Sequence, residues 1–176
     1  MLSLIFQLLR QSLLQITDLK EVDWFINQFN KDGEFALTTT PGVYLQFGLI
    51  KAQPLTQKVQ LLEFNFQAHL VNECLYDNAQ RMIDNTIHNH HALIDQVFIT
   101  LQNRSAWLSD LPAFAALAGT GDDNLIFNEL VRDSIQPDHV ASNLITTTQS
   151  FSGVAYDYTA EAEFIDKIAN LVTIVN

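Results

Sequence analysis

The sequence predicts an α+β fold: an antiparallel β-sheet of about four to five strands, with two or three helices packed on one face. The main observation is Leu62–Leu70, where apolar and polar residues alternate without a break, as in a strand with one buried face. The second is that helical patterns of apolar residues flank this strand, at Leu2–Ile16 and beyond Asn72. The third is that short connections join the predicted strands, which favours antiparallel neighbours.

The strand at Leu62–Leu70 has two chemically different faces. One face is apolar and consists of Leu62, Phe64, Phe66, Ala68 and Leu70. The other is polar and consists of Glu63, Asn65, Gln67 and His69. A sheet that is covered on one side only has this pattern, so we expect the apolar face to pack against helices at Leu2–Ile16 and Ile83–Leu101.

The N-terminal part of the chain is predicted to contain one helix and two strands before Leu62–Leu70. Apolar residues at helical spacing predict a helix at Leu2–Ile16. An approximate period of two predicts a strand at Val22–Asn27, with a short helix as the alternative, and a strand at Val43–Phe47. The stretch from Ala52 to Lys58 is polar and contains a proline, and we expect a connection there.

The middle of the chain is predicted to form a long helix and then an irregular segment. The helix should run from near Asn78 to Gln102, with Asp77 or Asn78 as its N-cap. Its apolar stripe contains Ile83, Ile87, His90, Ile94, Val97, Phe98 and Leu101. Asn103–Asn124 is the irregular segment, in which Asp110–Leu117 could add a short helix.

The C-terminal part is predicted to add two strands and a last helix. Phe127–Ile135 alternates loosely, Pro137-Asp138 should end that strand, and Leu144–Tyr158 is rich in strand-forming residues. Helical spacing returns at Glu161–Val172. We therefore expect a single domain over residues 1–176, with a loop insertion at about 103–124 and a C-terminal extension at about 159–176.

Composition limits the partners of the chain. Its 176 residues are 48% hydrophobic and only 16% charged, which predicts that some apolar surface is buried against partner subunits. A formal net charge of −11, with the basic residues scattered singly, predicts repulsion of nucleic acid and of anionic lipid. Met1–Arg10 has neither the basic n-region nor the cleavage site of a secretory leader, and it is too short to span a bilayer. We expect no membrane partner.

No motif in the sequence predicts catalysis. The chain has no G-x-S-x-G elbow, no phosphate-binding loop and no calcium-binding loop, and Ser152-Gly153 falls inside a predicted strand. The single cysteine, Cys74, excludes an intramolecular disulfide and is expected to be a small buried residue beside a strand end. We therefore predict a non-enzymatic protein without catalytic residues and without a cofactor.

One helix face carries a cluster that could bind a metal ion. Asp84, His88, His91 and Asp95 are spaced by four, three and four residues, which places them within roughly 60° around the helix. Because one straight helix cannot surround an ion, we predict a solvated face with Asp–His pairs and no bound metal. The alternative function is a small metal- or ligand-binding domain, or an enzyme, that uses this face. His90 points to the apolar stripe and is predicted to be a hydrogen-bonded core histidine.

The order of the predicted elements resembles the tail terminator and tail completion proteins of long-tailed bacteriophages. The similarity covers roughly Leu4 to Tyr158. It rests on the N-terminal helix, Leu19–Phe29, Thr40–Phe47, the long alternating strand, Leu93–Phe98 and Glu129–Asp133. The segment Asn103–Asn124 and the tail after Tyr158 depart from the family pattern.

This resemblance implies a structural role in the virion. In the family, a sheet with helices on one face forms a ring, commonly of six subunits, which caps the tail tube and joins it to the neck on the head side. It implies a homo-hexamer whose partners are tail tube and neck proteins, located at the head–tail junction of the virion and in the host cytoplasm during assembly. An acidic bore would let DNA pass without binding. The polar sheet face Glu63, Asn65, Gln67 and His69 would then lie toward neighbouring subunits or the bore.

Overall fold

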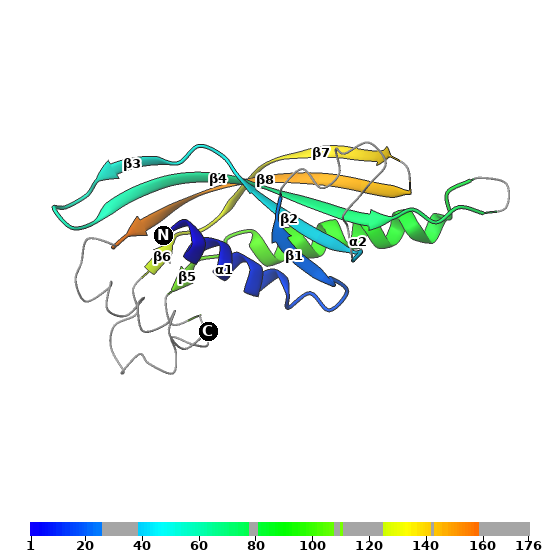
Figure 1. Ribbon diagram of the computed structural model, residues 1–176, viewed down its shortest axis with the longest axis horizontal. Coiled ribbons are helices and arrows are strands. Elements are labelled where there is room, and N and C mark those ends of the chain that lie inside the picture. Colours follow the sequence, from blue (N-terminus) through cyan, green and yellow to red (C-terminus); the bar gives the residue numbers. More distant parts are fainter. Residues whose placement is uncertain (26–38, 78–80, 108–109, 111–124, 142, 159–176) are drawn as a thin grey trace.

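The computed structural model describes residues 1–25, 39–77, 81–107, 110, 125–141 and 143–158 (Figure 1). Its elements in chain order are α1 (Leu2–Leu13), β1 (Glu21–Trp24), β2 (Gly42–Phe47), β3 (Lys51–Pro54), β4 (Gln60–Glu73), α2 (Asp84–Leu101), β5 (Ala106–Trp107), β6 (Leu125–Phe127), β7 (Val131–Ala141) and β8 (Leu144–Asp157). The helices Asp110–Leu117 and Glu161–Val172 and the C-terminal extension, all expected from sequence, lie outside the described residues, except for Asp110 itself.

The strands form one curled sheet whose centre is the pair β4 and β8. Each of these strands has 14 residues, and they pair antiparallel from Gln60–Asp157 to Glu73–Leu144. β2 and β3 pair with successive parts of β4, while β7 and β6 pair with successive parts of β8. β1 extends the sheet beside β2, and β5 extends it beside β6.

The predicted α+β class is confirmed, but two details of the sheet were wrong. The described sheet has eight strands rather than four or five, because short strands such as β5 carry too few residues to show a period. It is also mixed rather than antiparallel, since β1 runs parallel to β2. A parallel pair needs a long connection, and residues 25–41 supply one between these two strands.

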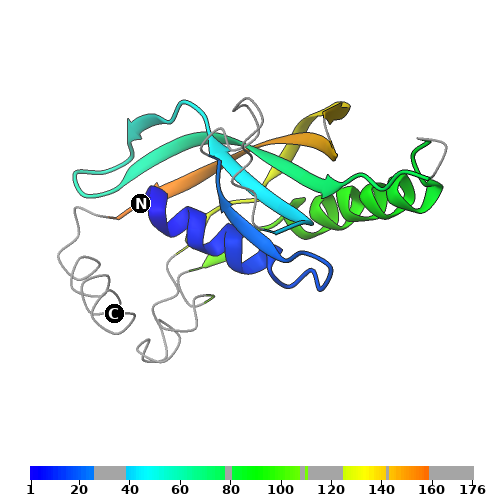
Figure 2. The ribbon, with the colours of Figure 1, turned by 45° about the vertical axis from the view of Figure 1, so that its right-hand side comes forward.

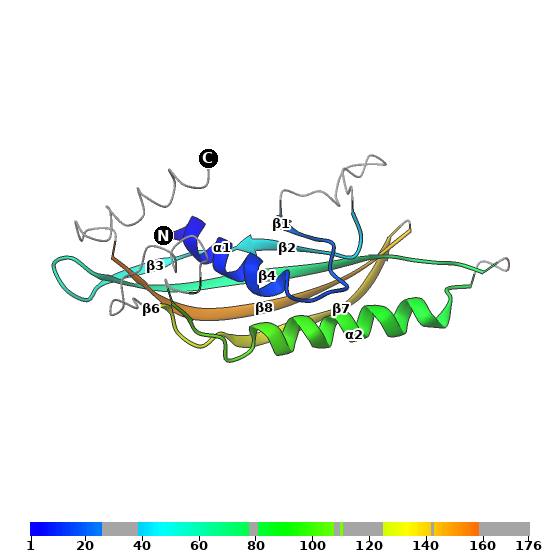
Figure 3. The same ribbon diagram turned by 90° about the horizontal axis from the view of Figure 1, so that it is seen from below.

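Both helices lie on one face of the sheet, as expected (Figures 1 and 3). The predicted apolar face of the central strand lies toward them, and each of its five side chains is at most 7% exposed. The ring of Phe66 stacks on Phe151 of β8 with centroids 5.4 Å apart, and Phe64 meets Phe127 edge to face. Gly153 lies opposite Phe64, where an added Cβ would stand 2.8 Å from a methyl carbon of Leu130. The alternating pattern therefore predicted correctly which face of the strand is buried and which side chains it adds to the core.

The first helix confirms the sequence prediction and ends slightly early. α1 buries Ile5, Leu9 and Leu13 completely, and the chain turns after Leu13 while Ile16 remains buried. The side chain of Arg10 lies outside the apolar stripe, and its Nε donates a hydrogen bond to the carbonyl oxygen of Val22 at 2.9 Å. This contact ties the helix to β1 at the edge of the sheet.

The second helix begins later than predicted. It starts at Asp84 after Ile83 in an extended conformation, and no side chain caps it. Asp77, one of the two residues expected to cap the helix, instead accepts hydrogen bonds from the backbone N and the Nε of Arg81. The other, Asn78, lies outside the described residues. The local ion pair with Arg81 occupies the carboxylate that a cap would need. The predicted stripe is correct at four positions, because His90, Ile94, Val97 and Leu101 are all buried. Ile87 and Phe98 are half-buried, whereas Ile83 precedes the helix and is 39% exposed.

The secondary structure predicted around two prolines, Pro54 and Pro137, was wrong. Ala52–Lys58 was expected to be a connection, but Lys51–Pro54 forms β3, where Pro54 is the last residue and faces Gln60. Pro137 was expected to end a strand, yet β7 continues through it to Ala141 with a register shift between Gln136 and His139. A bulge on an edge strand accommodates a residue that cannot donate to the ladder.

Candidate functional site

The histidine-rich face of α2 does not form a metal site in the described part of the chain. Asp84 lies in the first turn of the helix, and its side chain is not described. His88 and Asp95 are exposed, whereas Nε2 of His91 lies 2.7 Å from Oδ2 of Asp138 on β7. Within the described ranges, no three His, Cys, Asp or Glu side chains come close enough to hold a metal ion.

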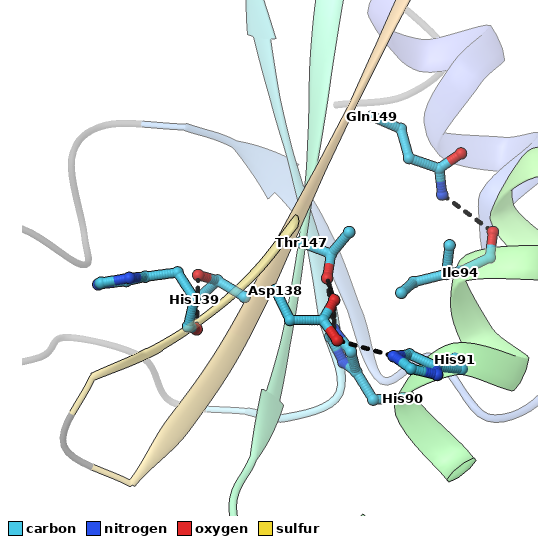
Figure 4. Close-up of polar contacts among 8 residues, drawn as sticks. His90, His91, Ile94, Asp138, His139, Thr147 and Gln149 are labelled. Atoms are coloured by element: carbon cyan, nitrogen blue, oxygen red, sulfur yellow. Dashed lines mark hydrogen bonds and ion pairs between the residues drawn. The ribbon is translucent and has the colours of Figure 1, made fainter. Parts of the chain in front are cut away.

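Asp138 joins two histidines through a short polar chain (Figure 4). Oγ1 of Thr147 donates to Oδ1 of Asp138, so this hydroxyl oxygen accepts from Nε2 of His90, at 2.8 Å. His90 is fully buried, while His91 at the other end of the chain reaches the surface. The neighbouring His139 points away from this group. The network thus runs from the surface to the core across α2, β7 and β8.

This arrangement has direct electrostatic consequences. Burial lowers the pKa of His90 to about 4, and the nearby Asp138 carboxylate only partly offsets that effect. Burial alone would raise the pKa of Asp138, but hydrogen bonds from Thr147 and His91 outweigh it and hold the pKa below its usual value. His90 is therefore neutral, with the proton on Nε2, and its buried Nδ1 has no hydrogen-bond partner among the described residues.

Further polar contacts hold α2 against the sheet. Nε2 of Gln149 donates to the backbone oxygen of Ile94, and Oε1 of Gln102 accepts from the backbone N of Arg132. The guanidinium of Arg132 lies 3.8 Å from the ring centroid of Phe98. These contacts are buried or half-buried, and we interpret the histidine network as a further contact that orients the helix rather than as a reactive site.

The opposite face of the sheet offers a more accessible surface. Of the four residues predicted as an interaction face, Glu63 and Asn65 are exposed and Gln67 and His69 are half-buried. His69 is held by Thr148 through Nδ1 and by Gln46 through Nε2. Burial lowers its pKa to about 4. The four side chains share one face but divide into an open pair and a bound pair.

A shallow groove of about 430 Å³ crosses this face at the open pair. It is lined by Leu49, Lys51, Glu63, Phe64, Asn65, Asn128, Glu129, Val131, Ser152, Gly153 and Val154. Ser152 in the groove donates to Oδ1 of Asp133, which places a further exposed carboxylate at its margin. The groove therefore combines apolar side chains, amides and an acidic margin, in a place that no single strand pattern could reveal.

Large apolar side chains are exposed at several separate places in the described structure. Leu49 and Leu55 lie on the β3–β4 hairpin and its approach, Ile99 lies on α2, and Ile135 and Val140 lie on the edge strand β7. Ile99 is 72% exposed and Leu49 is 73% exposed. Such residues on different sides of a molecule indicate more than one contact surface.

Comparison with known proteins does not assign the chain to a family. No family model matches the sequence, and no curated protein matches it. No helix among the described residues is long and apolar enough to cross a membrane.

Sequence reasoning found some of these features and missed others. It placed His90 in the core and Cys74 beside a strand end, and both residues are buried as expected. It missed Asp138 because a strand was expected to end there. The signal that could have found it is the Pro-Asp pair between two strand-like stretches, which is compatible with a bulge as well as with a break.

Proposed function

We propose that this protein is a non-enzymatic structural subunit that assembles into a closed ring of identical copies. The observation that carries the proposal is the exposure of large apolar side chains on separate surfaces: the β3–β4 hairpin, the outside of α2 and the edge strand β7. A contact between two different surfaces of the same subunit repeats from copy to copy and closes into a ring when the rotation allows.

The arrangement of the sheet also supports this proposal. In the described part of the structure α1 and α2 cover one face of the sheet, and on the other face Glu63 and Asn65 are exposed and available to a neighbour or to a bore. The groove on that face is shallow, and the His90 network is closed to solvent at its inner end. An enzyme would need convergent reactive groups in a deep pocket.

The particular role that we propose is that of a tail terminator or tail completion protein. The order of elements resembles that family, in which a ring, commonly of six subunits, caps the tail tube and joins it to the neck. A net charge of −11 fits a bore through which DNA passes without binding. The proposed location is the head–tail junction of a virion, with tube and neck proteins as partners.

The test is the mass and shape of the purified full chain. Native mass spectrometry and negative-stain electron microscopy over a range of protein concentrations should show one closed multimer with a central hole. Addition of isolated tail tubes should place that ring at one tube end. A strict monomer at high concentration, both alone and with tubes, would overturn the proposal, and binding of zinc or nickel by that monomer would favour the helix-face alternative.

A further inference from the structure

The hairpin formed by β3 and β4 projects beyond the helices. Its turn lies at the left end of the molecule in Figures 1 and 2, past the N-terminal end of α1. Every residue from Lys51 to Lys58 is exposed. The turn is nonetheless well defined, because Oγ1 of Thr56 accepts from the backbone N of both Lys58 and Val59, while the backbone N of Leu55 donates to the oxygen of Val59. The hairpin is a preorganised arm.

The tip of this arm combines an exposed apolar residue with a positive charge. Leu55 is 56% exposed. No acidic residue occurs from Leu49 to Gln60, in a chain with more than twice as many acidic as basic residues. Lys51 pairs in register with Glu63, but no carboxylate of the described residues forms an ion pair with Lys58. A surface complementary to this tip would therefore combine an apolar site with a neighbouring carboxylate.

The groove on the polar sheet face has that combination. Its apolar part includes Val131, which is 50% exposed, and Val154. Its margin carries the exposed carboxylates of Glu129 and Asp133, and among the described residues Lys51 alone supplies a positive charge to its lining. Because Lys51 faces Glu63 in the ladder, the charge that remains on the margin is negative.

We propose that the hairpin tip, Leu55–Lys58, docks into this groove on a second copy of the chain. Leu55 enters the apolar part beside Val131, and Lys58 pairs with the carboxylates of Glu129 and Asp133. Neither Leu55 nor Lys58 lines the groove of its own subunit, so the contact joins two different subunits. Tip and groove are different surfaces, and the contact is therefore head-to-tail. This inference rests on the proposed ring and identifies the surface through which it closes.

The first test uses cysteine pairs in the full chain with Cys74→Ala. The double variant Leu55→Cys with Val131→Cys should give, after mild oxidation, a ladder of linked subunits on a non-reducing gel, because each subunit offers one tip and one groove. Each single variant should give no ladder, and a mixture of the two single variants should stop at dimers. The matched control, Leu55→Cys with Ile99→Cys, places the second thiol on an apolar site of α2 that is more exposed than Val131, at 72% against 50%, and should remain unlinked.

The second test exchanges charges and separates this inference from the ring itself. Lys58→Glu and Glu129→Lys should each weaken assembly several-fold, and the double variant should recover most of that loss. Lys20→Glu, an exposed lysine away from both surfaces, is the control. A ring by native mass without the cysteine ladder, or with unchanged assembly of Lys58→Glu, would refute tip-to-groove docking and leave the ring in place. A strict monomer would refute both.

Discussion

On acidification this protein should lose stability at a higher pH than protonation of its carboxylates alone would cause, because His90 is buried in its uncharged form. The perturbation is a fall in pH from 7 to 5. His90 lies inside the network of Thr147 and Asp138, with His91 next to it on α2. Burial holds its pKa near 4, whereas the unfolded chain has the ordinary value of 6.5. Below pH 6.5 the unfolded chain therefore binds a proton that the folded chain refuses.

The size of this effect follows from the two pKa values. Above pH 7 the residue is neutral in both states and makes no difference to stability. At pH 5 His90 is almost fully protonated in the unfolded chain and almost fully neutral in the folded chain. This difference lowers the free energy of unfolding by about 2 kcal/mol. Below pH 4 the loss in free energy of unfolding levels off at about 3 kcal/mol.

Urea denaturation of the full chain at several pH values measures this loss. The comparison variant is His90→Gln, which keeps an amide donor for Thr147 but cannot be charged. Because the half-buried His69 also has a lowered pKa, the wild-type chain should lose more stability than His90 alone explains. The difference between the two pH profiles isolates His90. Parallel profiles for the wild type and His90→Gln between pH 7 and 5 would refute the reasoning.

Three further substitutions test the core and the network by denaturant unfolding. Phe66→Ala should cost about 3–5 kcal/mol, because it removes a ring stacked on Phe151, while the exposed Glu63→Ala should stay within about 0.5 kcal/mol. Gly153→Ala should cost about 1–3 kcal/mol, since its methyl group meets Leu130; an unchanged midpoint would mean that the strand moves freely. Asp138→Asn should cost about 1–3 kcal/mol and remove the acidic partner of His91, and equal stability would show that the network does not hold α2.

Period and alternation in the sequence were enough for the parts of the fold that bury a continuous face. The alternation at Leu62–Leu70 predicted which side meets the helices, and helical spacing predicted that His90 is buried. The predictions that failed depend on individual side-chain contacts and on strand pairing, which a periodic pattern does not contain. The start of α2 moved to Asp84 because Asp77 pairs with Arg81, and β7 runs through Pro137 because a bulge on an edge strand tolerates it.

The same limit explains the candidate sites. Spacing on one helix brought Asp84, His88, His91 and Asp95 to one face, but it could not show that Asp138 comes from β7 to bind His91. The groove is likewise formed by segments that are far apart in sequence, such as Leu49, Asn65 and Glu129. A periodic pattern describes one element at a time, so it cannot predict a site that several elements form together.

Charge sets a condition that any assembly of this chain must meet. Copies that each carry a net charge of −11 repel one another, although at physiological salt the repulsion is screened beyond about 8 Å. Association therefore depends on short-range contacts, and an exposed ion pair alone contributes at most about 1 kcal/mol. The burial of apolar residues such as Leu55 has to supply most of the free energy. Scarce cations such as Lys58 then act mainly on specificity, because a lysine that meets carboxylates at one place on the partner disfavours every other approach between two acidic surfaces.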